Sequence, residues 1–191
     1  MPHKDPAKNK AYRSTPEYRE HELEKATRKK HPSKKYKLEG HMTFQGLRIA
    51  VENKKGSTRS GHDKDGKPWH TLMKAAYGYI VGSKGADDEG VDCYVGPNEQ
   101  ATHAYVVHQK KKEDGNYDED KVMLGCSSLK EARELYLIHY NTSKFLGPIK
   151  EVPMERLKAL LSEKKTLTKI SSVMYAGFVD ELTAIWSSPC E

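Results

Sequence analysis

The sequence predicts an α+β fold in which a small β barrel or sandwich is followed by helices. Short runs that alternate apolar and polar residues recur over residues 43–124, separated by turns containing glycine and aspartate. From residue 128 onward, apolar residues instead recur at helical spacing. Residues 1–40 contain almost no Val, Ile, Leu or Phe. We therefore expect a basic arm over 1–40, a compact domain over 41–162, and a connector with an amphipathic helix over 163–191.

The composition fits a polar globular chain with a charged extension. Of the 191 residues, 36% are hydrophobic and 31% are charged, and the net charge is +6. Residues 1–40 hold twelve Lys or Arg against six Asp or Glu, so this segment accounts for the whole net charge. No apolar stretch approaches the roughly 20 residues that span a bilayer, and the N-terminus lacks the apolar core of a signal peptide. We expect a soluble, cytoplasmic protein that does not bind membranes.

The three cysteines lie far apart and form no CxxC pattern. This arrangement excludes a thiolate zinc site and a disulfide framework, and it is typical of a reducing compartment.

The basic arm has two interpretations that composition leaves open. A helix is predicted from Thr15-Pro16 to about Lys30, where His31-Pro32 ends it. In the first interpretation the arm binds nucleic acid, with lysines contacting phosphates. In the second it is a solubilising tail or an interdomain linker, because basic arms are common and nonspecific. The lysines predicted to contact nucleic acid are Lys29, Lys30, Lys34 and Lys35.

Alternation and turn residues predict the strands in order. Asp65-Gly66 is a strong hairpin signal, and a charged loop over residues 110–120 separates the last two strands. Ser128 and Glu131 form a capping box that begins a helix running to about Tyr140, and further helices begin near Pro153 and Ser171. The expected strands are TFQGLRIAVE (43–52), WHTLM (69–73), YGYIVG (77–82), CYVGP (93–97), HAYVVHQ (103–109) and KVMLG (121–125).

An acidic cluster, GSKGADDEGVDCYVGP over residues 82–97, precedes one of these strands. Side chains alternate along an extended chain, so Asp87 and Glu89 project to one side, and the turn before Asp92 can bring its carboxylate round to join them. Converging carboxylates repel one another, and Mg²⁺ relieves this repulsion by binding carboxylates together with substrate phosphate oxygens. The alternative is an acidic hairpin turn that holds no ion. A phosphate site also needs cations and hydroxyl donors, for which the candidates are Lys55, Arg59, Lys74, Lys121, Lys144, Tyr77 and Tyr140.

The string from Tyr77 to Pro97 resembles the signature region of the soluble family I inorganic pyrophosphatases. It is still more similar to the pyrophosphatase-like domain of bacteriophage and prophage polyproteins, which shares FQGLRIAVENKKGS, KVMLG and HYNTSKFLG. The resemblance covers about residues 42–161. It implies a small five-stranded OB-like β barrel with flanking helices, and Mg²⁺-dependent hydrolysis of pyrophosphate to phosphate. For a phage-encoded protein the compartment would be the host cell cytoplasm.

The resemblance also implies roles for individual residues. Asp87, Asp92 and Glu52 match metal ligands, and Asp118 or Asp120 would supply another. Glu89 falls where the family holds and deprotonates the attacking water, Tyr77 matches the tyrosine before the signature, and Arg59 would lie near the leaving group. The expected phosphate contacts are Lys121, Tyr140, Lys144 and Lys55.

Two departures from the family pattern keep a second function open. Glu89 replaces an aspartate and is one methylene longer, and displacing a catalytic group by about 1 Å can cost about a hundredfold in rate. The loop over residues 110–120 begins with lysines where an acid is expected. The alternative is a non-catalytic module that binds nucleic acid or phage components through its basic arm, and a nuclease is a weaker third reading. The sequence leaves a homo-oligomer open.

Overall fold

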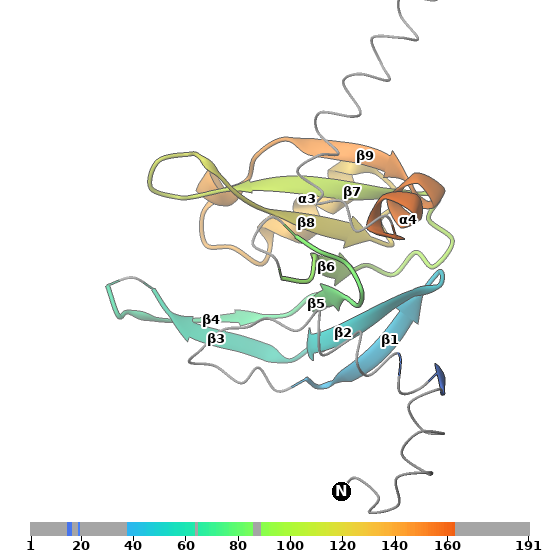
Figure 1. The fold of residues 1–191 in the computed structure, drawn as a ribbon. Helices are drawn as coiled ribbons and strands as arrows, with labels where there is room; N and C mark the ends of the chain where they lie inside the picture. Colours follow the sequence, from blue (N-terminus) through green and yellow to red (C-terminus); the bar gives the residue numbers. More distant parts are fainter. Residues whose placement is uncertain (1–14, 17–18, 20–37, 64, 86–88, 163–191) are drawn as a thin grey trace, which may run out of the picture.

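The structure is a computed structural model that describes residues 15, 16, 19, 38–63, 65–85 and 89–162. Most of the predicted arm and all of the predicted C-terminal helix lie outside the described residues, and so do Lys29, Lys30, Lys34, Lys35 and Asp87. The described part forms the elements labelled in Figure 1: β1 (Gly40–Phe44), β2 (Leu47–Asn53), β3 (Thr58–His62), β4 (Pro68–Leu72), β5 (Ala76–Ile80), β6 (Asp92–Val95), β7 (His103–Lys110), β8 (Tyr117–Leu124), α3 (Leu129–Leu137), η1 (Ser143–Phe145), β9 (Ile149–Pro153) and α4 (Met154–Ser162).

Seven strands form one sheet in the order β1-β2-β5-β6-β8-β7-β9, and β3 and β4 form a separate hairpin. Neighbouring strands are antiparallel except β6 and β8, which are parallel. The hairpin extends away from the larger sheet in Figure 1. The predicted α+β class is confirmed. The predicted five-stranded OB-like barrel is not, because among the described strands β1 and β9 are the unpaired edges of a sheet that does not close.

Two local features explain two of the three additional strands; β3 is the third. A turn at Gln45 and Gly46, with φ of 46° and 86°, splits the predicted strand 43–52 into β1 and β2. Positive φ at both central residues suits a tight hairpin, and the Gln45 amide fixes this turn by donating to the carbonyl oxygens of Glu99 (2.9 Å) and Ala101 (2.8 Å). At the other edge, the short charged segment Ile149–Pro153 forms β9 beside β7, although no alternating pattern marks it as a strand.

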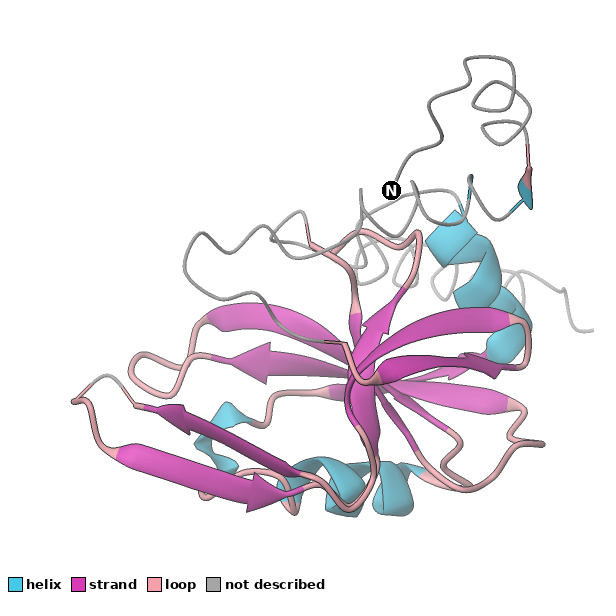
Figure 2. Ribbon diagram, turned by 90° about the horizontal axis from the view of Figure 1, so that it is seen from below, coloured by secondary structure: helices cyan, strands magenta, loops and turns pink. Residues whose placement is uncertain are grey.

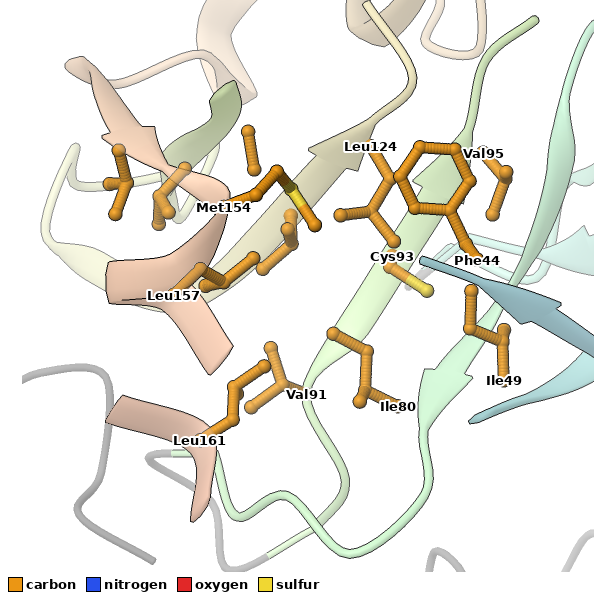
Figure 3. Close-up of a cluster of buried hydrophobic side chains, with 14 of the residues drawn as sticks. Phe44, Ile49, Ile80, Val91, Cys93, Val95, Leu124, Met154, Leu157 and Leu161 are labelled. Atoms are coloured by element: carbon orange, nitrogen blue, oxygen red, sulfur yellow. The ribbon is translucent and has the colours of Figure 1, made fainter. Parts of the chain in front are cut away.

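One face of the sheet packs against α4, and we call it the α4 face. Because side chains alternate along a strand, Cys93 and Leu124 point to this face. In Figure 3 they converge with Ile49 from β2 and with Met154 and Leu157 from α4. These apolar side chains are almost completely buried, so this face is the hydrophobic core of the domain.

The opposite face packs against α3 and is called the α3 face; Figure 2 shows helices on two sides of the sheet. Its buried residues include Tyr77, Tyr94, Met123 and Tyr136. Three of these are tyrosines, so this face brings hydroxyl groups into a largely apolar layer. The candidate site lies here.

Helix α3 begins at the predicted cap. The Ser128 Oγ accepts a hydrogen bond from the Glu131 N–H (3.2 Å), and the Glu131 carboxylate accepts one from the Ser127 N–H (2.7 Å), one residue earlier than a capping box requires. The helix ends at Leu137, and a turn places His139 and Tyr140 directly after it. Across the described residues, no helix is long and apolar enough to cross a membrane.

Candidate active site

A buried charge pair lies at the centre of the α3 face. Asp92 of β6 and Lys121 of β8 are directly opposite each other in the parallel pair. The Lys121 Nζ donates to Asp92 Oδ2 at 2.8 Å, and the Tyr77 hydroxyl donates to the same oxygen. The side chains of Lys121 and Asp92 are 4% and 1% exposed. Three predicted site residues from three strands are therefore in direct contact.

The surroundings decide the charge of each of these groups. Burial is the largest single effect and acts to lower the pKa of Lys121, but Asp92, Tyr77, Tyr140 and Glu119 together outweigh it, so the pKa is raised well above its ordinary value. Burial also raises the pKa of the Tyr77 hydroxyl, and the negative charge of Asp92 raises it further. The site thus combines an ammonium ion with a neutral phenol that donates a hydrogen bond.

A bulge between β7 and β8 adds two further carboxylates. Between the paired residues His108 and Asp120 and the next pair, β8 has one more residue than β7, so Asp118 and Glu119 both lie opposite Gln109. The Gln109 Nε2 donates to Asp118 Oδ2 (3.0 Å) and to Glu119 Oε1 (3.1 Å). The Glu119 carboxylate also lies 2.9 Å from the Lys121 Nζ.

Tyrosines from α3 and the turn after it meet the other end of Gln109. The rings of Tyr136 and Tyr140 stack with centroids 4.5 Å apart. Their hydroxyls donate to Gln109 Oε1 at 2.8 Å and 2.9 Å. Burial is the main cause that raises the pKa of Tyr140 well above its ordinary value, so its hydroxyl is a neutral donor. This arrangement connects a predicted phosphate-binding tyrosine to the carboxylates around Lys121.

His139 is a buried neutral histidine at the same face. Its Nε2 accepts a hydrogen bond from the Lys74 N–H (2.9 Å), so Nδ1 carries the proton that bonds the Leu135 carbonyl oxygen at 2.7 Å. The ring stacks on Tyr94 at 4.7 Å. Burial is the main cause that lowers the pKa of His139.

The β3-β4 hairpin supplies the second cation. The Arg59 guanidinium lies 4.5 Å from the centroid of the Tyr77 ring and 5.8 Å from that of Trp69. The Lys121 Nζ lies 5.5 Å from the Tyr77 centroid. Trp69 lies across Gly61, where an added Cβ would be 2.6 Å from Trp69 Cζ2. Tyr77 therefore has two cations close to its ring, one from the hairpin and one from the sheet.

Three other predicted residues differ in burial and lie on other segments of the chain. Glu52 is buried and is the extra residue of a second bulge, opposite Gly78 and Tyr77 of β5. Lys55 and Lys144 are exposed, and Lys144 lies in η1, which contacts β7.

Glu89 is at the end of the acidic loop, whose two ends are held together. Its carbonyl oxygen accepts a hydrogen bond from the Gly85 N–H at 2.6 Å. The buried Ser83 hydroxyl donates to the Ile80 carbonyl oxygen (2.6 Å) and accepts from the Val91 N–H (2.9 Å). Asp87 lies outside the described residues, between these two fixed ends.

Asp120 does not join the site, although it was predicted as an alternative metal ligand. It is next to Lys121 on β8, so alternation turns its side chain to the α4 face. There its Oδ1 lies 2.5 Å from the His108 Nδ1, and both residues are buried. Counting in steps of two from Lys121 leads instead to Glu119, so the period of the strand was the signal that could have identified Glu119.

The described residues offer only part of a magnesium site. No group of three or more His, Cys, Asp or Glu side chains that could hold a metal ion occurs among them. Asp118 and Glu119 share one donor nitrogen, Gln109 Nε2, and carboxylate oxygens are the ligands that Mg²⁺ prefers. One oxygen of Asp92 already bonds Lys121 and Tyr77. The donor set fits Mg²⁺ chemically, but a complete site needs a further carboxylate, and Asp87 is the predicted one.

Comparison with known proteins supports the resemblance noted from the sequence. No curated protein matches the chain. A solved inorganic pyrophosphatase from Coxiella burnetii is 14% identical, with a TM-score of 0.30, over 56% of this chain and 84% of that one. The model of the family described as Inorganic Pyrophosphatase matches residues 28–162, well over half of the chain. The particular likeness to the domain of bacteriophage polyproteins stays a prediction. The chain belongs to the inorganic pyrophosphatase family.

Proposed function

We propose that this protein hydrolyses inorganic pyrophosphate, or a related phosphoanhydride, to phosphate in a reaction that requires Mg²⁺. The observation that carries the proposal is the buried Lys121 ammonium, which Asp92 and Glu119 hold beside the Tyr77 hydroxyl. Burying a charge is costly unless it is paired and hydrogen-bonded, as Lys121 is. In a chain of this family, a fixed buried cation beside a second cation is what a phosphoanhydride substrate needs.

Two cations and two neutral hydroxyls would bind the substrate. Phosphoryl transfer depends mainly on positioning and on neutralising charge on the phosphoryl oxygens. Arg59 and Lys121 lie against the same Tyr77 ring, so each can contact a different phosphoryl group of one small anion. The hydroxyls of Tyr77 and Tyr140 stay protonated because burial raises the pKa of both. To donate to a phosphate oxygen, each would turn its single proton away from its present acceptor, Asp92 Oδ2 or Gln109 Oε1.

The carboxylates would serve the ion and the attacking water. When bound, Mg²⁺ neutralises the phosphoryl oxygens and lowers the pKa of that water. Asp118 and Glu119 would hold it together with Asp87 and Asp92. We assign to Glu89 the role of accepting a proton from the water. Because its side chain is one methylene longer than aspartate, a rate below that of enzymes with aspartate here is expected.

Phosphate release from pyrophosphate, measured with and without Mg²⁺, tests this proposal. We expect release only with Mg²⁺, and a loss of at least about a hundredfold in Asp92→Asn, because Lys121 then loses its buried partner. Asp65→Asn is the matched control: it makes the same change at an exposed residue whose Asn-Gly product still suits the hairpin turn. Assays are run below the melting temperature of each variant. The proposal fails if wild type releases no phosphate at any Mg²⁺ concentration, or if Asp92→Asn matches it.

The alternative function, binding nucleic acid through residues 1–40, rests on residues that lie almost entirely outside the described part of the chain. Nothing in the described residues favours it.

A further inference from the structure

Gln109 is a buried amide at the centre of the α3 face, and the proposed chemistry assigns it no role. It is 5% exposed, and four side-chain groups surround its amide. We propose that Gln109 is a positioning residue that holds the phosphate-binding groups in register with one another. The proposal rests on the proposed function, because it concerns the same site.

The bonding partners fix the orientation of the amide. Carboxylates only accept hydrogen bonds, so the nitrogen of Gln109 must face Asp118 and Glu119. The oxygen then faces Tyr136 and Tyr140, and both hydroxyls must donate to it. No other side chain of this shape provides a donor at one end and an acceptor at the other. A glutamate would turn the donor end into a third carboxylate.

This orientation connects the two halves of the phosphate site. At one end, Gln109 and Lys121 contact the same oxygen of Glu119, Oε1, so the amide fixes the carboxylate that steadies the ammonium. At the other end it fixes the position of the Tyr140 hydroxyl oxygen, from which the proton can turn to a phosphate oxygen. A shift of either end therefore changes the spacing between Tyr140 and Lys121, which are predicted to contact the same anion.

The β7-β8 bulge explains why one amide can do this. In a regular strand Asp118 and Glu119 would point to opposite faces, and a single side chain could not bond both. The extra residue in β8 turns both carboxylates toward Gln109. Bulges of this kind occur beside active sites, where they redirect side chains.

Two substitutions test the role. Gln109→Met keeps the length of the side chain and removes all four hydrogen bonds, so we expect kcat/KM for pyrophosphate to fall at least about tenfold. Gln109→Glu keeps the shape but faces Asp118 and Glu119 with a carboxylate in place of the N–H donor. Its loss of kcat/KM should therefore exceed that of Gln109→Met.

Gln100→Met and Gln100→Glu are the matched controls, because Gln100 is exposed and, among the described residues, only its backbone N–H is bonded, to Asn98. Both should keep kcat/KM within about twofold of wild type. A merely structural role for Gln109 would lower the melting temperature of both Gln109 variants and leave kcat/KM, measured below that temperature, within about twofold of wild type. That result overturns the inference while the proposed function stands.

Binding of inorganic phosphate, measured by calorimetry, separates the two proposals. If wild type does not hydrolyse pyrophosphate but binds phosphate, the proposed function fails. Gln109→Met is then still expected to bind phosphate about tenfold more weakly than wild type. Equal affinity in the two proteins, or no phosphate binding by wild type, overturns the role of Gln109.

Discussion

Replacing Lys121 by methionine should destabilise the domain strongly. At the 2.8 Å that separates its Nζ from Asp92 Oδ2, Coulomb's law with an effective dielectric constant of about 20 gives a gross attraction of about 6 kcal/mol. Removing one partner of a buried ion pair typically costs about 3 to 5 kcal/mol, because the other charge stays buried without compensation. In a chain of this size, that loss lowers the melting temperature by about 10 °C or more.

Thermal and urea denaturation measure this loss. Lys130→Met is the matched control, since Lys130 forms an exposed pair with Glu134 at 4.0 Å, and it should change stability by at most about 0.5 kcal/mol. Combining Lys121→Met with Asp92→Asn removes both charges, so the double variant should lose less stability than the two single losses added together. The reasoning is refuted if Lys121→Met is no less stable than Lys130→Met, or if the two single losses simply add.

Two further predictions concern the surroundings of the site. Gly61→Ala should displace the Trp69 ring, because the new Cβ would lie 2.6 Å from it. We expect a change in tryptophan fluorescence and, because Arg59 shifts with the hairpin, about a tenfold loss of pyrophosphatase activity. Unchanged activity would contradict the role of the hairpin. Because burial lowers the pKa of His139, its contribution to stability is complete above about pH 6.5 and is lost as the pH falls through the lowered value. We would measure the free energy of unfolding by urea denaturation at pH 8 and at pH 5. The decrease between the two pH values should be smaller for His139→Gln than for wild type, whereas His70→Gln, at an exposed position, should match wild type. Equal decreases in all three proteins would rule out this effect.

The sequence predicted the parts of the site that lie on regular strands. Tyr77, Asp92 and Lys121 were singled out, and the structure brings them into contact. Arg59, which the resemblance placed only loosely, lies over the Tyr77 ring. These residues were accessible because the resemblance to the pyrophosphatase signature assigned each of them a role, with Asp92 fixed by the order of acids after a strand.

Gln109 and Glu119 were missed for a physical reason. Alternation places Glu119 on the face of Lys121, but it does not show that β7 pairs with β8 in the register that sets Glu119 opposite Gln109. The contact with Asp118 depends on a bulge, and one extra residue leaves no mark in the alternation of a strand. Gln109 also carries no charge and belongs to a run that reads simply as a strand. The same limit applies to the overall architecture: local alternation predicted most strands, but not that β9 would join the edge of an open sheet rather than a closed barrel.

The parallel pairing of β6 with β8 has a consequence for folding. The two strands are far apart in sequence, since Lys121 follows Asp92 by 29 positions, and pairings between distant segments form slowly. A slip of β8 by one residue would turn Lys121 into the apolar layer beneath α4 and leave Asp92 buried without its counter-charge. Such a misaligned sheet would be too unstable to persist. The residues proposed to bind substrate thus also favour the correct register of β8 when the sheet assembles.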